Sequence, residues 1–139
     1  MRAMIFAAGL GTRMGAISEH LAKPALPVCG VSILAYALAK LEAAGIDEVV
    51  INTFHRGQDV QEAIEQVARD STTITWSHET PEILGTGGGL GLVKDFLSES
   101  GDPFVVMNGD TLLEVDLLSV IAKHRETQAL ATLVIREDD

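Results

Sequence analysis

A glycine-rich segment near the start of the chain carries residue types that bind phosphate. It spans Ala7–Met14 (AAGLGTRM), and its first two residues are also the last two of the apolar run Met4–Ala8. Glycines directly after a buried strand let the backbone approach a ligand and aim consecutive N–H groups at an anion. Arg13 adds a guanidinium whose fork of donors suits phosphate oxygens. Taken alone, the segment fits either a triphosphate cradle or a glycine-rich turn with a solvated cation.

A second cation follows ten residues later in a stiff segment. Lys23 is followed by Pro24, and Pro27 limits the backbone further. Two better-known phosphate loops are excluded. The dinucleotide fingerprint G-x-G-x-x-G needs a third glycine where Met14 stands, and a Walker A loop needs a Gly-Lys-Ser/Thr ending that the segment lacks.

A carboxylate occurs where a second buried strand is expected to end. Asn108-Gly109-Asp110 follows the apolar run Phe104–Met107. A carboxylate in that position can hold Mg²⁺, which bridges the phosphates of a bound nucleotide. The same three residues also fit a polar turn, since Asn-Gly and Gly-Asp are common turn dipeptides.

A third unusual segment, Leu84–Gly91, has five glycines among eight residues. Each glycine in a helix costs about 1 kcal/mol relative to alanine, so packing alone does not favour this composition. A flat ligand such as a nucleobase, lying against bare backbone, would explain it. A flexible loop without a ligand remains the alternative.

Strands and helices are expected to alternate along the chain. Short apolar or β-branched runs predict strands at Met4–Ala8, Glu48–Asn52, Thr72–Trp76, Phe104–Met107 and Ala131–Ile135. Apolar residues at helical spacing predict helices at Ser32–Ala44, Gln58–Arg69, Thr86–Leu97 and about Leu117–Glu126, with Ser32 as an N-cap. This order predicts an α/β fold in three layers, with a mostly parallel, Rossmann-like sheet between helices. Ligands of such sheets lie beyond the carboxyl ends of the strands.

The length and net charge of the chain limit the partners that it is expected to bind. The 139 residues suit one domain, and the formal net charge of −10 disfavours nucleic acid and anionic membranes as partners. Any phosphate must therefore be held by a local arrangement of donors. The single cysteine, Cys29, excludes an intramolecular disulfide and is expected to be buried. No run resembles a signal peptide or a membrane span, so we expect a cytoplasmic protein.

Four segments in this order resemble the sugar-phosphate nucleotidyltransferase family. Its members join a nucleoside triphosphate to a sugar 1-phosphate and release pyrophosphate. The family signature A-A-G-x-G-T-R-(M/L) matches Ala7–Met14, and K-P-x-x-P-(V/I) matches Lys23–Val28. L-G-T-(A/G)-G matches Leu84–Gly88, and N-G-D matches Asn108–Asp110. The resemblance implies the nucleotide-diphospho-sugar transferase type of fold.

The resemblance also implies roles for individual residues. Arg13, Lys23 and Asp110 would be catalytic, with Asp110 binding Mg²⁺. Sugar phosphate would attack the α-phosphorus directly, without an enzyme nucleophile. Glu79 would lie near the base, where it could accept hydrogen bonds from guanine. The full set of expected nucleotide-binding residues is Ala8, Gly9, Leu10, Gly11, Thr12, Glu79, Gly85, Thr86 and Asn108.

Family members continue well beyond the length of this chain, and their later segments supply much of the sugar pocket. The resemblance therefore implies that residues 1–139 are the nucleotide-binding portion of a longer domain, incomplete on its C-terminal side. Such a portion would expose a sheet edge through which homo-oligomers can form. Two other functions stay open. Arg13-Met14-Gly15 is also typical of cytidylyltransferases of cofactor and isoprenoid synthesis, although Lys23-Pro24 and Leu84–Gly88 favour the sugar branch. The second alternative is a non-catalytic module for nucleotide binding or assembly.

Overall fold

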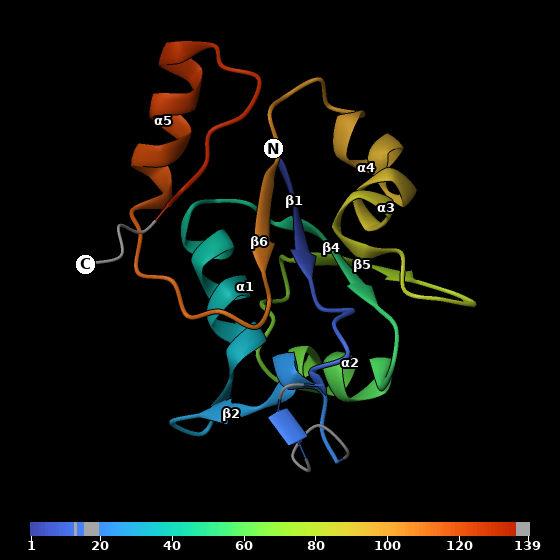
Figure 1. Cartoon of the computed structure of the whole chain (residues 1–139). Helices are drawn as coiled ribbons and strands as arrows, with labels where there is room; N and C mark the ends of the chain where they lie inside the picture. Colours follow the sequence, from blue (N-terminus) through green and yellow to red (C-terminus); the bar gives the residue numbers. More distant parts are fainter. Residues whose placement is uncertain (13, 16–19, 136–139) are drawn as a thin grey trace.

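A computed structural model describes residues 1–12, 14–15 and 20–135. Its elements alternate as the sequence predicts (Figure 1). In chain order they are β1 (Arg2–Phe6), the 3-10 helix η2 (Lys23–Ala25), β2 (Pro27–Val28), β3 (Val31–Ser32), α1 (Ile33–Ala43), β4 (Glu48–Thr53), α2 (Gly57–Glu65), β5 (Thr73–His78), α3 (Gly85–Leu92), α4 (Lys94–Ser98), β6 (Val105–Asn108) and α5 (Leu117–Thr127).

Four strands form a parallel sheet in the order β5-β4-β1-β6. In the centre, Ala3 of β1 is paired with Val49 of β4 on one side and Val105 of β6 on the other. The short β2–β3 hairpin is a separate antiparallel pair. The predicted parallel sheet is confirmed, and its carboxyl edge brings together the segments that follow β1 and β6.

Alternate side chains of the two central strands face two different helical layers. Ala3 and Ile5 of β1 belong to the cluster that includes α1 and α2, and Leu117 of α5 joins it. Met4 and Val50 face the opposite way and pack against α3 and α4. Figure 1 shows α1 and α3–α4 on opposite sides of the sheet. This arrangement is the predicted three-layer fold.

The helix α1 begins and ends where the capping residues in the sequence predict. The Ser32 hydroxyl accepts a hydrogen bond from the Ala35 N–H at 3.2 Å, which is an N-cap. Gly45 follows the helix with φ of +74°, and the Ile46 N–H returns to the Leu41 carbonyl at 3.0 Å. The helix buries Leu34, Leu38 and Leu41 against the sheet. None of the helices in the described ranges is long and apolar enough to cross a membrane.

The strand predicted at Ala131–Ile135 is wrong. This segment has no strand hydrogen bonds, and Leu133 and Ile135 are 81% and 80% exposed. Its β-branched residues have the right propensity, but a strand forms only where a neighbouring strand pairs with it. The helix predicted at Thr86–Leu97 is also interrupted, because α3 ends at Leu92 and α4 begins at Lys94.

Cys29 is exposed, contrary to the expectation that it is buried. It lies at the turn between β2 and β3 with φ of +52°, next to Gly30 at φ of +81°. A turn of this kind points outwards from a two-stranded hairpin, so the small apolar side chain has no core to enter.

Candidate active site

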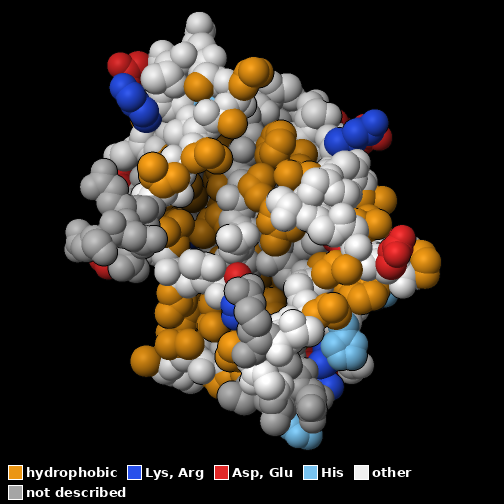
Figure 2. Space-filling model, viewed as in Figure 1, with side chains coloured by type: hydrophobic (Ala, Val, Ile, Leu, Met, Phe, Trp, Pro, Cys, Tyr) orange, Lys and Arg blue, Asp and Glu red, His pale blue; other side chains and the backbone are white. Residues whose placement is uncertain are grey.

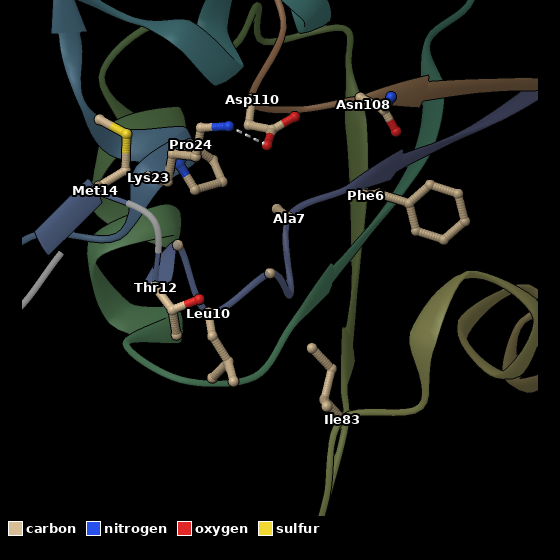
Figure 3. A pocket seen from close by; sticks show the side chains of 12 residues that line it. Phe6, Ala7, Leu10, Thr12, Met14, Lys23, Pro24, Ile83, Asn108 and Asp110 are labelled. Carbon is tan, nitrogen blue, oxygen red and sulfur yellow. Dashed lines mark hydrogen bonds and ion pairs between the residues drawn. The ribbon is translucent and has the colours of Figure 1, made fainter.

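A pocket of about 340 Å³ lies beyond the carboxyl ends of β1 and β6 (Figure 3). It combines glycine-rich backbone, one lysine, one carboxylate and several apolar side chains. The lining residues are Phe6, Ala7, Gly9, Leu10, Gly11, Thr12, Met14, Lys23, Pro24, Ile83, Asn108 and Asp110. Parallel α/β folds bind their ligands at this edge of the sheet.

The loop after β1 forms one wall of the pocket. Gly9, Leu10, Gly11 and Thr12 all line it, as the sequence predicts. Gly11 has φ of +65°, and the Met14 N–H donates to the Gly11 carbonyl at 2.8 Å, so the backbone turns sharply here. Such turns aim successive N–H groups into one space, which suits an anion. The loop thus turns tightly at the wall of the pocket, and phosphate binding by it stays a prediction.

Two residues of this loop that were expected to bind nucleotide are not among the described residues that line the pocket. Ala8 is 5% exposed and is not among the lining residues, so it belongs to the packing beneath the loop. Arg13 lies outside the described residues, and its role stays a prediction.

Lys23 and Asp110 meet inside the pocket although 87 residues separate them in the sequence. The ammonium donates to Asp110 Oδ2 at 2.7 Å, shown as the dashed line in Figure 3. Both side chains are partly exposed, at 31% and 37%. Water therefore still reaches the pair and screens it, so a ligand can exchange for either partner. The pair thus places one cation and one carboxylate side by side in the pocket.

Gly109 lets the turn that carries Asp110 lie directly against β1. Its N–H donates to the Phe6 carbonyl at 2.9 Å, continuing the pairing of β6 with β1. A Cβ added to Gly109 would lie 2.8 Å from Leu34 Cδ1 and 2.9 Å from the Phe6 carbonyl oxygen. A larger residue is therefore excluded unless the turn moves, and Asp110 would move with it.

Lys23 is positioned from the other side by the N-terminal turn of α2. The Ala22 N–H donates to Asp59 Oδ2 at 2.9 Å, and Arg56 Nε donates to the same oxygen at 2.6 Å. Arg56 also donates to the His20 carbonyl at 2.6 Å. These contacts tie the backbone directly before Lys23 to a helix that is packed on the sheet.

The contacts that Asp59 makes with Ala22 and Arg56 depend on pH, because they need its carboxyl to be ionised. Burial would raise the pKa of its carboxyl, but hydrogen bonds from Arg56 and from the Ala22 N–H outweigh burial and lower the pKa. A carboxyl with a lowered folded pKa adds stability above its unfolded pKa and loses it as the pH falls through the folded value.

We therefore expect the stability advantage of the native chain over Asp59→Asn to shrink as the pH falls below about 4. Urea unfolding of both proteins between pH 7 and pH 3 would measure it. Asp70→Asn, on an exposed side chain, is the matched control. A constant difference between native and Asp59→Asn chains across this range would contradict the assignment.

The structure separates Glu79, Gly85 and Thr86 from the pocket lining. Glu79 is 1% exposed, and its two oxygens accept from Asn52 Nδ2 and the Leu84 N–H, each at 2.7 Å. Each oxygen therefore already has a partner within the protein, and the role of Glu79 beside the base stays a prediction. Gly85 and Thr86 are exposed at the start of α3. Ile83, just before them, does line the pocket.

Sequence reasoning missed several residues of the site. Phe6, Pro24 and Ile83 line the pocket as apolar contacts, and such residues carry no chemical signature in a sequence. Asn52 was also missed. The available signal was a polar residue in the last part of a buried strand, where its side chain must find partners.

A sequence model of the nucleotidyl transferase family matches residues 2–139. The chain belongs to the nucleotidyl transferase family. It is 31% identical to UTP–glucose-1-phosphate uridylyltransferase of Synechocystis sp. over 98% of this chain and 37% of that protein. It is 36% identical to N-acetylmuramate alpha-1-phosphate uridylyltransferase of Neisseria meningitidis serogroup B over 84% of this chain and 49% of that protein.

A solved structure has a similar arrangement of elements. HddC from Yersinia pseudotuberculosis, complexed with GMP-PN, superposes with a TM-score of 0.75 at 26% identity. The match covers 88% of this chain and 53% of that one. The chain thus spans half or less of the curated relatives named above and about half of the solved one.

The donors of this nucleotidyl transferase pocket fit a magnesium ion held together with a ligand. Within the described ranges, no group of three or more His, Cys, Asp or Glu side chains is close enough to hold a metal alone. Magnesium usually takes one or two carboxylates and completes its six ligands with substrate phosphates and water. Asp110 offers such a carboxylate, whose Oδ1 accepts from Thr111 Oγ1 at 3.2 Å and from no other residue in the described ranges.

Proposed function

We propose that this chain is the nucleoside triphosphate half of an enzyme that converts a nucleoside triphosphate and a sugar 1-phosphate into a nucleoside diphosphate sugar and pyrophosphate. The observation that carries the proposal is the pocket in which the Gly9–Thr12 loop, Lys23 and Asp110 converge. Membership of the nucleotidyl transferase family and the sugar-phosphate names of the relatives support it.

In this reaction an oxygen of the sugar phosphate attacks the α-phosphorus of the nucleotide. The bond between the α-phosphorus and its bridging oxygen to the β-phosphorus breaks, and pyrophosphate leaves with the electron pair. The N–H groups of the Gly9–Thr12 loop orient the phosphates, and Arg13 adds charge at the end of that loop. Lys23 leaves Asp110 for a phosphate oxygen and neutralises charge as it develops.

Asp110, released from Lys23, would hold Mg²⁺ against the phosphates with Asn108 beside it. When bound, the ion offsets negative charge on the transferring and leaving phosphates. Positioning supplies the rest of the catalysis, because no nucleophile of the protein is needed.

The base would lie between the loop after β1 and the glycine-rich start of α3. Leu10 and Ile83 are 45% and 39% exposed and line this side of the pocket, where they would contact a flat ring. Gly85 and Thr86 follow directly, and their backbone groups would read the edge of the base. The sugar 1-phosphate would be held mainly by parts of the protein beyond these residues, since relatives are about twice as long.

Calorimetric titration with GTP, UTP, dTTP, CTP and ATP in the presence of Mg²⁺ tests the proposal. Saturable binding of one or two nucleotides, weakened by Lys23→Met and by removal of magnesium with EDTA, is the expected result. Preference for CTP, with transfer to an alcohol acceptor, would favour the cytidylyltransferase alternative. Absence of binding by every nucleotide would overturn the proposal and favour an assembly module.

We also propose that two copies of this chain associate through β6. Among the described residues β6 pairs only with β1. Val106 on this strand is 39% exposed, and Phe104, directly before the strand, is 44% exposed. Hydrophobic side chains gather around β6 and the segment after α5 on the face shown in Figure 2. Unpaired edges of this kind invite pairing with another strand.

Sedimentation over a range of concentrations is expected to show self-association of the native chain. Val106→Lys should weaken this association because a charged side chain protects a sheet edge. Thr75→Lys, on the opposite edge strand β5, should leave it unchanged. A native chain that stays monomeric at all concentrations would contradict the proposal.

A further inference from the structure

Three hydrogen bonds, two of them buried and one partly buried, connect the two sides of the pocket. The Ala7 N–H donates to Asn52 Oδ1 at 2.7 Å, and Asn52 Nδ2 donates to Glu79 Oε1 at 2.7 Å. Glu79 Oε2 then accepts from the Leu84 N–H at 2.7 Å. Asn52 and Glu79 are 2% and 1% exposed. This series of hydrogen bonds thus runs from Ala7, the first residue after β1, to Leu84, the residue that precedes α3.

Each of these three hydrogen bonds has a fixed donor and a fixed acceptor. The Ala7 N–H can only donate, so Asn52 must turn its oxygen towards it and its amide NH₂ towards Glu79. The Leu84 N–H can also only donate, so Glu79 must present acceptors to both neighbours. With Asn52 as a donor, a side chain with two acceptor oxygens satisfies both neighbours at once. A buried polar group left without a partner is costly, so the residue types at positions 52 and 79 depend on each other.

The surrounding backbone is packed closely on the side chains of Asn52 and Glu79. A Cβ added to Gly89 would lie 2.9 Å from Glu79 Oε1 and 3.1 Å from Asn52 Nδ2, so glycine lets α3 lie directly over them. The Glu79 N–H also donates to the Thr53 carbonyl at 2.8 Å, which anchors Glu79 to β4. At the start of α3, its carboxylate meets the end of a helix that favours negative charge.

We propose that Asn52 and Glu79 are positioning residues that hold the phosphate loop and the start of α3 together as one binding unit. This inference rests on the proposed function in one respect: the ligand that spans both sides is a nucleoside triphosphate. Neither side chain touches it. They act through the Ala7 and Leu84 amides, and so set the distance between the phosphate side and the base side of the pocket.

An exchange of residue types provides the test. Asn52→Asp brings two carboxylates together, and Glu79→Gln places an amide NH₂ against another donor. Each single variant is expected to lower affinity for MgGTP or MgUTP by about tenfold, as loss of a buried hydrogen bond implies. In the double variant, the introduced aspartate accepts from Ala7 and from the introduced glutamine, whose oxygen accepts from Leu84. The double variant should recover affinity to within about threefold of the native value.

Inorganic tripolyphosphate separates positioning from general damage. It contacts the phosphate side alone, so its affinity should change much less than that of the nucleotide in the single variants. Val50→Ala is the matched control, because Val50 is fully buried on β4 yet has no part in the chain of hydrogen bonds. It should lower the unfolding temperature without changing nucleotide affinity at a temperature where every variant is folded.

Amide hydrogen exchange followed by NMR tests the connection without any ligand. Both Ala7 and Leu84 amides should exchange faster in Asn52→Asp and in Glu79→Gln, and both should regain protection in the double variant. Faster exchange at only the neighbouring amide of each variant, or no recovery in the double variant, would overturn the inference while leaving the proposed function intact. Recovered protection in a chain that binds no nucleotide would support the connection and overturn the proposed function instead.

Discussion

Replacing Asp110 with asparagine is expected to lower the magnesium-dependent affinity for nucleoside triphosphate by more than about tenfold, and by up to about 100-fold. The amide has the shape of the carboxylate, and its oxygen can still accept from Lys23 at the 2.7 Å position. It lacks the negative charge that a magnesium ion prefers in its ligands. The substitution is therefore expected to remove a magnesium ligand with little change in packing.

Calorimetry with magnesium, and again with EDTA, measures this effect. The two proteins should differ strongly with the metal present and little without it, because the loop after β1 and Lys23 remain. Asp95→Asn, an exposed carboxylate on α4, is the matched control and should bind as the native chain does. Equal metal-dependent affinity of Asp110→Asn and native chain would place the metal ligand elsewhere.

Replacing Gly109 with alanine is expected to lower the free energy of unfolding by about 1–3 kcal/mol, as overpacking of a filled interior does. The added methyl group would meet Leu34 Cδ1, the Phe6 carbonyl oxygen and Ile5 Cγ2, at 2.8 Å, 2.9 Å and 3.0 Å. A side chain can shift by rotation, but the Phe6 carbonyl belongs to the central strand and accepts the Gly109 N–H. Relief thus requires the end of β6 to move away from β1.

Urea unfolding gives the stability change, and the position of Asp110 gives a second readout. Since the turn carries Asp110, nucleotide affinity should fall in Gly109→Ala under conditions where it is fully folded. Gly91→Ala, in α3 with open space around the added methyl, should be neutral or raise stability by up to about 1 kcal/mol. Equal stability of native and Gly109→Ala chains would show that β6 adjusts without cost.

Local signals were enough to predict most of the fold. The apolar runs of β1, β4 and β6 are bounded by glycine or polar residues, and Ser32 and Gly45 mark the ends of a helix. Parallel strands share one carboxyl edge, so the loop after β1 and Asp110 could be expected to meet there. The sequence could not show that Asp110 pairs with Lys23, because that contact depends on how η2 is held by α2.

The errors arise where the outcome depends on distant partners. Residues at Ala131–Ile135 favour a strand, but pairing needs a neighbour, and among the described residues none is in place. The burial of Glu79 likewise involves a distant residue, since Asn52, 27 positions away, donates to it at 2.7 Å. Neither the lack of a strand partner nor this hydrogen bond can be predicted from the spacing of residues in the sequence.

The exposed turn at Cys29 also makes the chain suitable for fluorescent labelling. Cys29 is the one cysteine of the sequence, so a thiol-reactive dye would attach at a single position without removal of other thiols. The turn belongs to the hairpin that follows η2, whose first residue is Lys23, so the dye would respond to a rearrangement of η2 that extends into this hairpin. Stopped-flow fluorescence of the labelled protein would then record the arrival of nucleotide in real time.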